Sequence, residues 1–143
     1  MWAGLLKRST TSNGKVFWRE LKLSPERLNQ YLDQLAWVSP QQTPTYFKKP
    51  LQKKLYWINA HNALMLRLVL DHYPEKPMPE QLINTRYRVA GSVCSLDTIR
   101  MQLVELDPGR DYAQFLSVYT ASHLPLVKVV SEAMLLKPYN LIQ

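Results

Sequence analysis

Few residues of this chain could carry out covalent chemistry, and they are scattered along the sequence. The chain has one cysteine, Cys94, and its histidines are His61, His72 and His123. Cys94 could act as a nucleophile if His61 or His123 accepted its proton, because a thiolate needs a base within hydrogen-bond reach. No glycine-framed turn surrounds Cys94, and a lone cysteine at a strand end is more often a small buried apolar side chain. We therefore expect an unreactive thiol.

The same residue types do not predict a metal site. If His61 and His72 lie on one helix, about three turns separate them, which is too far to ligate one ion. The sequence contains no cluster of cysteines and histidines and no histidine pair at the helical spacing of zinc ligands. We expect no metal and no cofactor, and a single cysteine excludes an intramolecular disulfide.

Two asparagines, Asn59 and Asn62, share one face of an otherwise apolar stretch. Their amides could bind a ligand or a peptide backbone. Alternatively, each amide could satisfy the backbone of a neighbouring loop, because buried polar groups in proteins are nearly always hydrogen-bonded. We favour the second interpretation, in which both side chains are buried and fix how loops pack on this stretch.

A further candidate site is basic. Lys48, Lys49, Lys53 and Lys54 lie among aromatic residues, a combination that can hold phosphates and stack bases. The first 54 residues contain ten Lys and Arg against three Asp and Glu, and they account for the net charge of +7. This imbalance suggests an anionic partner, such as nucleic acid or lipid headgroups, although a solvated basic surface is the simpler interpretation. The sequence identifies no particular partner.

These candidates must be positioned by the elements around one long segment, residues 51–73. This segment is apolar on most of its circumference, which predicts a helix in the middle of the fold. Pro50 suits the first turn of such a helix, and Pro74 ends it. Arg67 and Asp71 are four positions apart and predict an ion pair on the one strip that faces water.

The rest of the chain predicts further helices and little sheet. Ser24 and Pro25 have the types favoured at a helix start, and that helix would run to Ser39. The other predicted elements are a short helix at 2–7, a connecting segment at 16–23, a hairpin of 85–89 with 93–94, a helix from Ser95 to Leu106, a strand at 115–119 and a helix over 125–136. This order predicts a single α+β domain, residues 1–143, with helices dominant around the central helix and with a small hairpin and one further short strand.

Length and composition agree with such a domain. At 143 residues and 46% hydrophobic content the chain can bury a core, and its charge is too low for disorder. No apolar run reaches the roughly 18 residues that a membrane span needs. The sequence as given shows no signal peptide, because the apolar run from Trp2 to Leu6 is too short and is followed by Lys7 and Arg8.

The segment from Tyr56 to Leu64, read together with Leu70 to Pro74, resembles the signature of the domain of unknown function 547 family. Members of that family typically read Trp-x-Asn-Ala-Tyr-Asn-Ala here, with Tyr-Pro shortly after. The resemblance runs from about Gly14 to about Pro125 and includes a Ser-Leu-Asp helix start that ends in Asp97. It implies that this chain corresponds to the N-terminal and middle part of the family's domain, with Asp97 as a ligand-binding or structural group. Many bacterial members are exported, so the resemblance also implies an exported bacterial protein if a signal peptide precedes this sequence.

The sequence departs from the family pattern where the resemblance would place reactive groups. Members commonly continue their Ser-Leu-Asp with a nearby acid and a histidine, and those places hold Arg100 and Met101 in this chain. Members also commonly carry a histidine before the late strand and two cysteines in or after it, where this chain has Gln114, Tyr119 and Leu124. The resemblance therefore implies a diverged active site in a shortened member.

Three functional hypotheses follow. The first is a non-catalytic or diverged binding or interaction domain, which we favour. The second is a thiol hydrolase-like enzyme that uses Cys94 with a histidine. The third is a domain that binds polyanions or nucleic acid through its basic first 54 residues.

Overall fold

The structure, a computed structural model, describes residues 1–120 and 124–136. Helices dominate it, and within the described residues the only sheet is a two-stranded antiparallel hairpin, so the predicted helix-dominant α+β class is confirmed. The elements are α1 (Trp2–Ser9), α2 (Trp18–Leu23), α3 (Glu26–Trp37), η1 (Pro44–Tyr46), α4 (Pro50–His72), α5 (Pro79–Asn84), β1 (Tyr87–Val89), β2 (Ser92–Cys94), α6 (Leu96–Leu106), η2 (Ala113–Phe115) and α7 (Glu132–Leu136).

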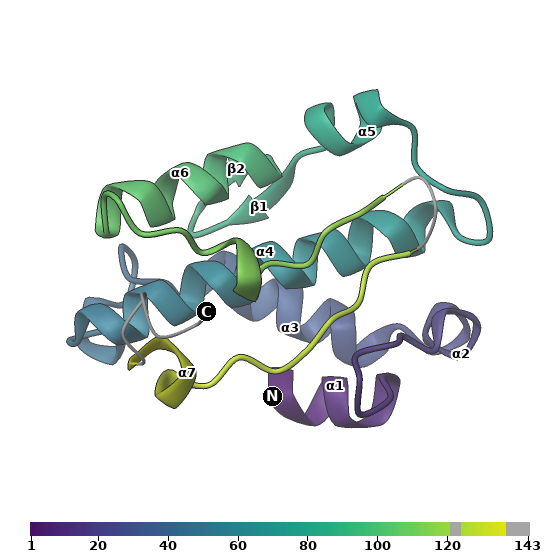
Figure 1. Cartoon of the computed structure of the whole chain (residues 1–143), viewed down its shortest axis with the longest axis horizontal. Helices are drawn as coiled ribbons and strands as arrows, with labels where there is room; N and C mark the ends of the chain where they lie inside the picture. The colour runs from purple at the N-terminus through teal and green to yellow at the C-terminus, as the bar shows by residue number, and fades with distance from the viewer. Residues whose placement is uncertain (121–123, 137–143) are drawn as a thin grey trace.

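Helix α4 lies in the middle of the fold, and the other elements surround it (Figure 1). Its bounds agree closely with the predicted 51–73. Pro50 occupies the first turn, where a missing N–H removes no helical hydrogen bond. The Gln52 side chain accepts a hydrogen bond of 3.0 Å from the Lys49 N–H and closes this end. Nearly every side chain from Tyr56 to Leu70 is buried, as expected for a helix that is apolar on most sides.

Lys22 contacts the C-terminal end of α4, and an ion pair lies on the exposed side of the helix. The Lys22 Nζ, from α2, donates to the carbonyls of Leu70 at 2.9 Å and Tyr73 at 2.6 Å. Carbonyls at a helix end lack the partners of interior ones, and a cation there complements the helix dipole. On the exposed side the Arg67 Nε donates to Asp71 Oδ1 at 2.8 Å, which confirms the predicted ion pair.

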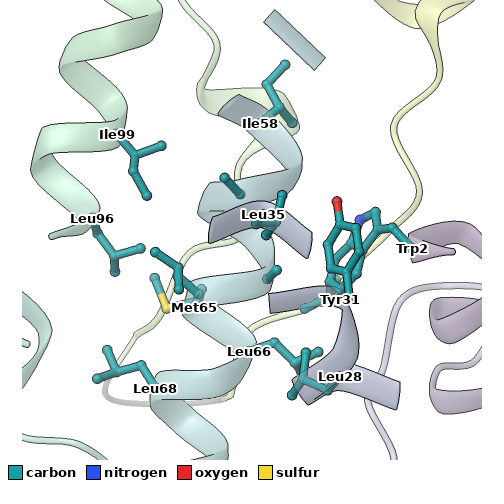
Figure 2. Close-up of a cluster of buried hydrophobic side chains, with 14 of the residues drawn as sticks. Trp2, Leu28, Tyr31, Leu35, Ile58, Met65, Leu66, Leu68, Leu96 and Ile99 are labelled. Atoms are coloured by element: carbon teal, nitrogen blue, oxygen red, sulfur yellow. The ribbon is translucent and has the colours of Figure 1, made fainter. Parts of the chain in front are cut away.

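Helices α6 and α3 pack on opposite sides of α4, as Figure 2 shows. Leu96 and Ile99 of α6 face Met65 on one side. Tyr31 of α3 lies on the other side, where the Trp2 ring stacks on it with 5.0 Å between ring centroids. The first helix of the chain thus joins the core through α3.

The hairpin turn closes the C-terminal end of α3. Ala90 and Gly91 form the turn, and both have positive φ angles, 54° and 78°, which two-residue hairpin turns of this kind require. Their N–H groups donate to the carbonyls of Leu35 at 3.1 Å and Ala36 at 2.9 Å. The predicted hairpin is therefore confirmed, and its turn supplies the donors that the end of α3 needs.

The predicted start of the helix after Ser24 was wrong. Ser24 follows the last residue of α2, and its N–H donates to the Glu20 carbonyl at 3.1 Å. Pro25 takes the capping position of α3, and no side chain caps that end. Residues 18–23 form a helix of their own because Trp18 and Leu21 both turn into the core, so the serine belongs to the preceding element.

The late part of the chain is extended rather than helical. The predicted strand at 115–119 was wrong, because Phe115 ends η2 and residues 116–119 pair with no described strand. The predicted helix over 125–136 was wrong for 125–131, and only α7 is helical. The Val127 N–H donates to the Gly14 carbonyl at 2.8 Å, and this distant contact favours an extended backbone in a valine-rich stretch. Figure 1 shows the two extended segments running in opposite directions along α4.

Candidate functional site

Asn62, on the side of α4 that faces the late segment, fixes residues 115–117 against the helix. Its Nδ2 donates to the Phe115 carbonyl at 2.9 Å, and its Oδ1 accepts from the Ser117 N–H at 2.8 Å. The residue is 1% exposed. Asn62 therefore bonds loop backbone, as the interpretation from sequence expected.

His61 immediately precedes Asn62 and is completely buried. Its Nδ1 lies 3.1 Å from Asn62 Oδ1, and because that oxygen is an acceptor, Nδ1 carries the ring proton. The His61 Nε2 is buried and has no hydrogen-bond partner among the described residues. Burial lowers the pKa of His61 to about 4, although the hydrogen bond to Asn62 opposes this, so the imidazole is neutral at pH 7.

Arg110 contributes a second set of buried groups without partners. Its Nη1 donates to the Leu135 carbonyl of α7 at 3.0 Å, and its Cζ lies 5.1 Å from the ring centroid of Tyr112. Its Nε and Nη2 are buried and have no acceptor in the part of the chain that the structure describes. These two nitrogens form one edge of the guanidinium, and such an edge binds a carboxylate through two parallel hydrogen bonds.

The turn after α6 brings Arg110 inward. Gly109 has a φ of 89°, which reverses the chain directly before the arginine. Asp107 accepts hydrogen bonds from the Tyr112 hydroxyl at 2.7 Å and from the Lys54 Nζ at 3.1 Å, so it ties the turn to α4. The Tyr112 hydrogen bond first, and then Lys54 and the charge of Arg110, hold the pKa of Asp107 below its usual value, although burial opposes them. Arg110 could not be predicted from the sequence as a site residue, because only the turn before it indicates a buried position.

His61 and Arg110 border the same cavity, which has a volume of about 290 Å³. Helices α4 and α6 and the segment 110–118 supply its walls. Its volume is close to the lower end of ordinary small-molecule sites, about 300 Å³. Its polar lining includes His61, Arg100, Arg110 and Tyr112, and its apolar lining includes Leu103, Val104, Leu116 and Val118. Two arginines and the Asp111 carboxylate thus border the cavity beside an apolar wall, while the His61 side chain itself is 0% exposed.

Asn59 does not share the role of Asn62. It is half-buried and borders a different cavity of about 270 Å³, together with Tyr31 and Tyr56. Its Oδ1 is buried without a partner among the described residues, so the expectation that this oxygen bonds loop backbone was wrong. Three positions along a helix rotate a side chain by about 60°, and this offset gives the two amides different neighbours.

Cys94 lies in the hairpin and is buried. Its Sγ is 3.9 Å from both the Val89 and Ser92 carbonyl oxygens, and no described histidine is among its hydrogen-bond partners. Burial raises the pKa of the Cys94 thiol, and the charge of Arg86 opposes this only in part. His123, the other candidate base, lies outside the described residues.

Two of the three positions aligned with the family's histidine and cysteines border a groove. This groove of about 510 Å³ lies between the extended segments 114–120 and 124–130, and Gln114 and Leu124 help to line it. Tyr119 packs against the core. Lys128 is the only charged side chain among the groove's described lining residues, so these carry no acid or imidazole to act as a base.

The basic candidates divide into two groups. Lys54 is half-buried and forms the ion pair with Asp107 described above. Lys48 and Lys49 are exposed beside the start of α4, and Lys53 is half-buried in its first turns. Lys54 therefore contributes to the packing of α4 against the turn after α6, and the other three lysines remain the candidates for a phosphate-binding surface.

Asp97 forms an ion pair at the protein surface. Asp97 is exposed in the first turn of α6, and its Oδ1 accepts a hydrogen bond of 2.7 Å from Arg100. No group of three Cys, His, Asp or Glu residues in the described ranges is arranged to hold a metal ion. Likewise, none of the described helices has the length and apolar character that crossing a bilayer requires.

Comparison with known proteins relates the chain to one family. No curated protein and no solved structure matches it. The family model described as "Protein of unknown function, DUF547" matches residues 47–132, a range that contains α4, the hairpin, α6 and every residue lining the cavity of His61 and Arg110. The matched range is more than half of the sequence, and the chain therefore belongs to the DUF547 family.

Proposed function

We propose that the chain is a non-catalytic binding domain and that the cavity of His61 and Arg110 binds a small anionic molecule. The observation that carries this proposal is the edge of Arg110 formed by Nε and Nη2, which is buried without an acceptor among the described residues. Buried N–H groups without an acceptor are costly, and an anion that accepts from this edge would remove that cost. The charge of Arg110 itself already interacts with the Asp107 carboxylate. A carboxylate matches the two parallel donors of this edge.

The surroundings of Arg110 support a carboxylate with an apolar body. The contacts to the Leu135 carbonyl and the Tyr112 ring hold the guanidinium in place before any ligand arrives, which lowers the entropic cost of binding. The apolar wall of Leu103 and Val104 gives a hydrocarbon group a place to be buried.

The environment of Cys94 supports the non-catalytic part of the proposal. We expect iodoacetamide to alkylate this thiol slowly, with a rate that rises only above the ordinary thiol pKa, because burial favours the protonated form. The measurement is the pH dependence of labelling, followed by mass spectrometry. Fast labelling at pH 6 that disappears in His61→Ala or His123→Ala would instead favour the thiol hydrolase alternative.

The binding proposal is tested by titrating phenylacetate into the ¹⁵N-labelled chain. We expect saturable shifts in the amides of residues 110–118, and we expect Arg110→Gln to weaken binding by about tenfold or more, since hydrogen bonds to charged groups are strong. Arg110→Lys keeps the charge but loses the paired donors, so its affinity should lie between the two.

Arg19→Gln, which changes an exposed arginine of α2, is the matched control and should bind as the wild type does. Circular dichroism and thermal melting confirm that each variant is folded. The proposal fails if the wild type shows no saturable shifts, or if folded Arg110→Gln binds phenylacetate with unchanged affinity.

A further inference from the structure

Trp37, the last residue of α3, is a tryptophan on the protein surface. It is 60% exposed, whereas Trp2, Trp18 and Trp57 are 5%, 8% and 3% exposed and belong to the core. Single exposed apolar side chains are common in proteins, so exposure alone indicates no function. The residues that lie beside the Trp37 ring decide what it can bind.

Two arginines of the hairpin lie on the side of the fold where Trp37 is exposed. The Arg88 Cζ, from β1, is 5.9 Å from the centroid of the Trp37 ring, within the range of a cation–π contact. Exposure alternates from Arg86 to Val89, so Arg86 and Arg88 share the solvent face of this extended segment. Neither arginine forms an ion pair within the described residues. An exposed ring and two uncompensated cations therefore lie together.

We infer that this surface, formed by Trp37, Arg86 and Arg88, binds single-stranded nucleic acid, with a base stacked on the Trp37 ring and phosphates held by the arginines. A base in a single strand has a free π face, and aromatic side chains stack on any base. Arginine binds phosphate through paired donors and also stacks on ring faces, so Arg88 can serve both groups.

The charge of the whole chain favours the same partner. The net charge is +7, which attracts a polyanion before any specific contact forms. No residue of the surface lines the cavity of Arg110, so the inference goes beyond the proposed function and does not depend on it.

Tryptophan fluorescence reports on this surface directly, because Trp37 is exposed and the other tryptophans are buried. We expect an oligothymidylate of about 12 nucleotides, within the usual site sizes, to quench the emission as it binds. An abasic oligomer of the same length carries the same phosphates without bases. It should bind about tenfold more weakly and should not quench the emission. Equal affinities for the two oligomers would overturn the inference.

Variants separate the stacked base from the phosphate contacts, with binding followed by the anisotropy of a labelled oligothymidylate. Trp37→Ala should weaken binding by about tenfold, the loss of one stacked base. Arg86→Gln should reduce the slope of log affinity against log salt concentration by about 0.7, the loss of one phosphate contact on a single strand. The inference fails if folded Trp37→Ala binds with wild-type affinity, or if Arg86→Gln leaves the salt slope unchanged.

Leu23→Ala is the control variant. It also shortens an exposed apolar side chain, which is 75% exposed at the end of α2, away from the hairpin (Figure 1). This variant should bind oligothymidylate as the wild type does. Circular dichroism and thermal melting confirm that all the variants are folded.

An anionic membrane is the other partner that the test must separate, because Val93, opposite Arg88 in the hairpin, is also 57% exposed. We expect vesicles of phosphatidylglycerol to leave the tryptophan emission unshifted, since the Arg88 charge lies against the ring that would have to enter the lipid. A blue shift with vesicles, together with no quenching by oligothymidylate, would assign the surface to membranes and overturn the inference.

Discussion

Asn62 joins two distant parts of the chain through one amide. Its two hydrogen bonds to residues 115 and 117 lie at a site that is 1% exposed, so water cannot replace them when the side chain is removed. We expect Asn62→Leu to lower the free energy of unfolding by about 1–3 kcal/mol, the cost of leaving buried backbone groups unsatisfied. Urea unfolding followed by circular dichroism measures this change.

Asn59→Leu is the matched control for that substitution. The Asn59 Oδ1 has no partner among the described residues, so the leucine breaks no hydrogen bond of that oxygen and should cost less than the change at Asn62. Equal losses for the two variants would show that the backbone contacts of Asn62 contribute little.

His61 should make the stability depend on pH. The pKa of its imidazole is about 4 in the folded chain against an ordinary 6.5, so below pH 6.5 the unfolded chain binds a proton that the folded chain excludes. Stability is therefore complete above about pH 6.5 and falls as the pH drops toward 4, by on the order of 3 kcal/mol.

The effect of His61 is isolated by comparing urea unfolding at pH 7.5 and pH 4.5 in the wild type and in His61→Phe. The variant should lose much less stability between the two values, and the other histidines contribute equally to both proteins. The same pH dependence in both would assign it to groups other than His61.

The hairpin turn contains two residues with positive φ angles, a glycine, which tolerates them, and an alanine, which does not favour them. Ala90 has a φ of 54°, which costs a residue with a β-carbon about 1–2 kcal/mol, whereas the neighbouring Gly91 takes its positive φ without that cost. Ala90→Gly should therefore raise the free energy of unfolding by about 0.5 kcal/mol, after the added chain entropy of glycine is subtracted.

Gly91→Ala is the opposite change and should lower stability by about 1–2 kcal/mol. A β-carbon at this position would also come within 2.7 Å of the Gln42 Nε2. Thermal melting of both variants checks these two predictions. If Ala90→Gly is destabilised, the packing of the alanine methyl group contributes more to stability than its positive φ angle costs.

The elements that local sequence predicts well are those whose signal is itself local. Helix α4 is apolar on most sides and has a proline at its start, so neighbouring residues alone identify it. Residues 125–131 have apolar spacing that suits a helix, but their backbone is extended where Val127 bonds Gly14, more than a hundred positions away. No short stretch of sequence contains both residues of that contact.

The candidate site likewise contains residues that the local sequence predicts and residues that it does not. Asn62 was recognisable because an amide on an apolar helix face needs a partner. Arg110 was not, because its burial depends on a turn at Gly109 and on the carbonyl of Leu135 from a separate helix. The protonation of His61 could be assigned only once its Asn62 contact was known.

The uneven distribution of charge along the chain predicts how the protein binds polyanions. The basic first 54 residues include Lys48 and Lys49, both exposed, and Lys53, which is half-buried. We expect retention on heparin that weakens with salt, and we expect the combined change of these three lysines to Gln to lower the salt concentration of elution.

Lys54→Gln is the control, because Lys54 already pairs with Asp107 inside the structure. This variant should elute close to the wild type, and it should lose at most about 1 kcal/mol of stability, since the pair is partly exposed to solvent. If the triple substitution leaves elution unchanged, these lysines do not form a polyanion-binding surface.

The contact of Lys22 with the end of α4 has a consequence for any shortened form of this protein. The family match covers residues 47–132, yet the ammonium that contacts the carbonyls at the end of α4 comes from residue 22. We therefore expect the unit that folds cooperatively to extend beyond the region matched by the family model. An expressed fragment limited to 47–132 would carry every residue that lines the cavity, but it would lose the Leu135 carbonyl that Arg110 binds. Its central helix would end in bare carbonyls and its α3 side would face water. We expect such a fragment to unfold, and selection on the first 46 residues to preserve the helix they complete rather than the motif they precede.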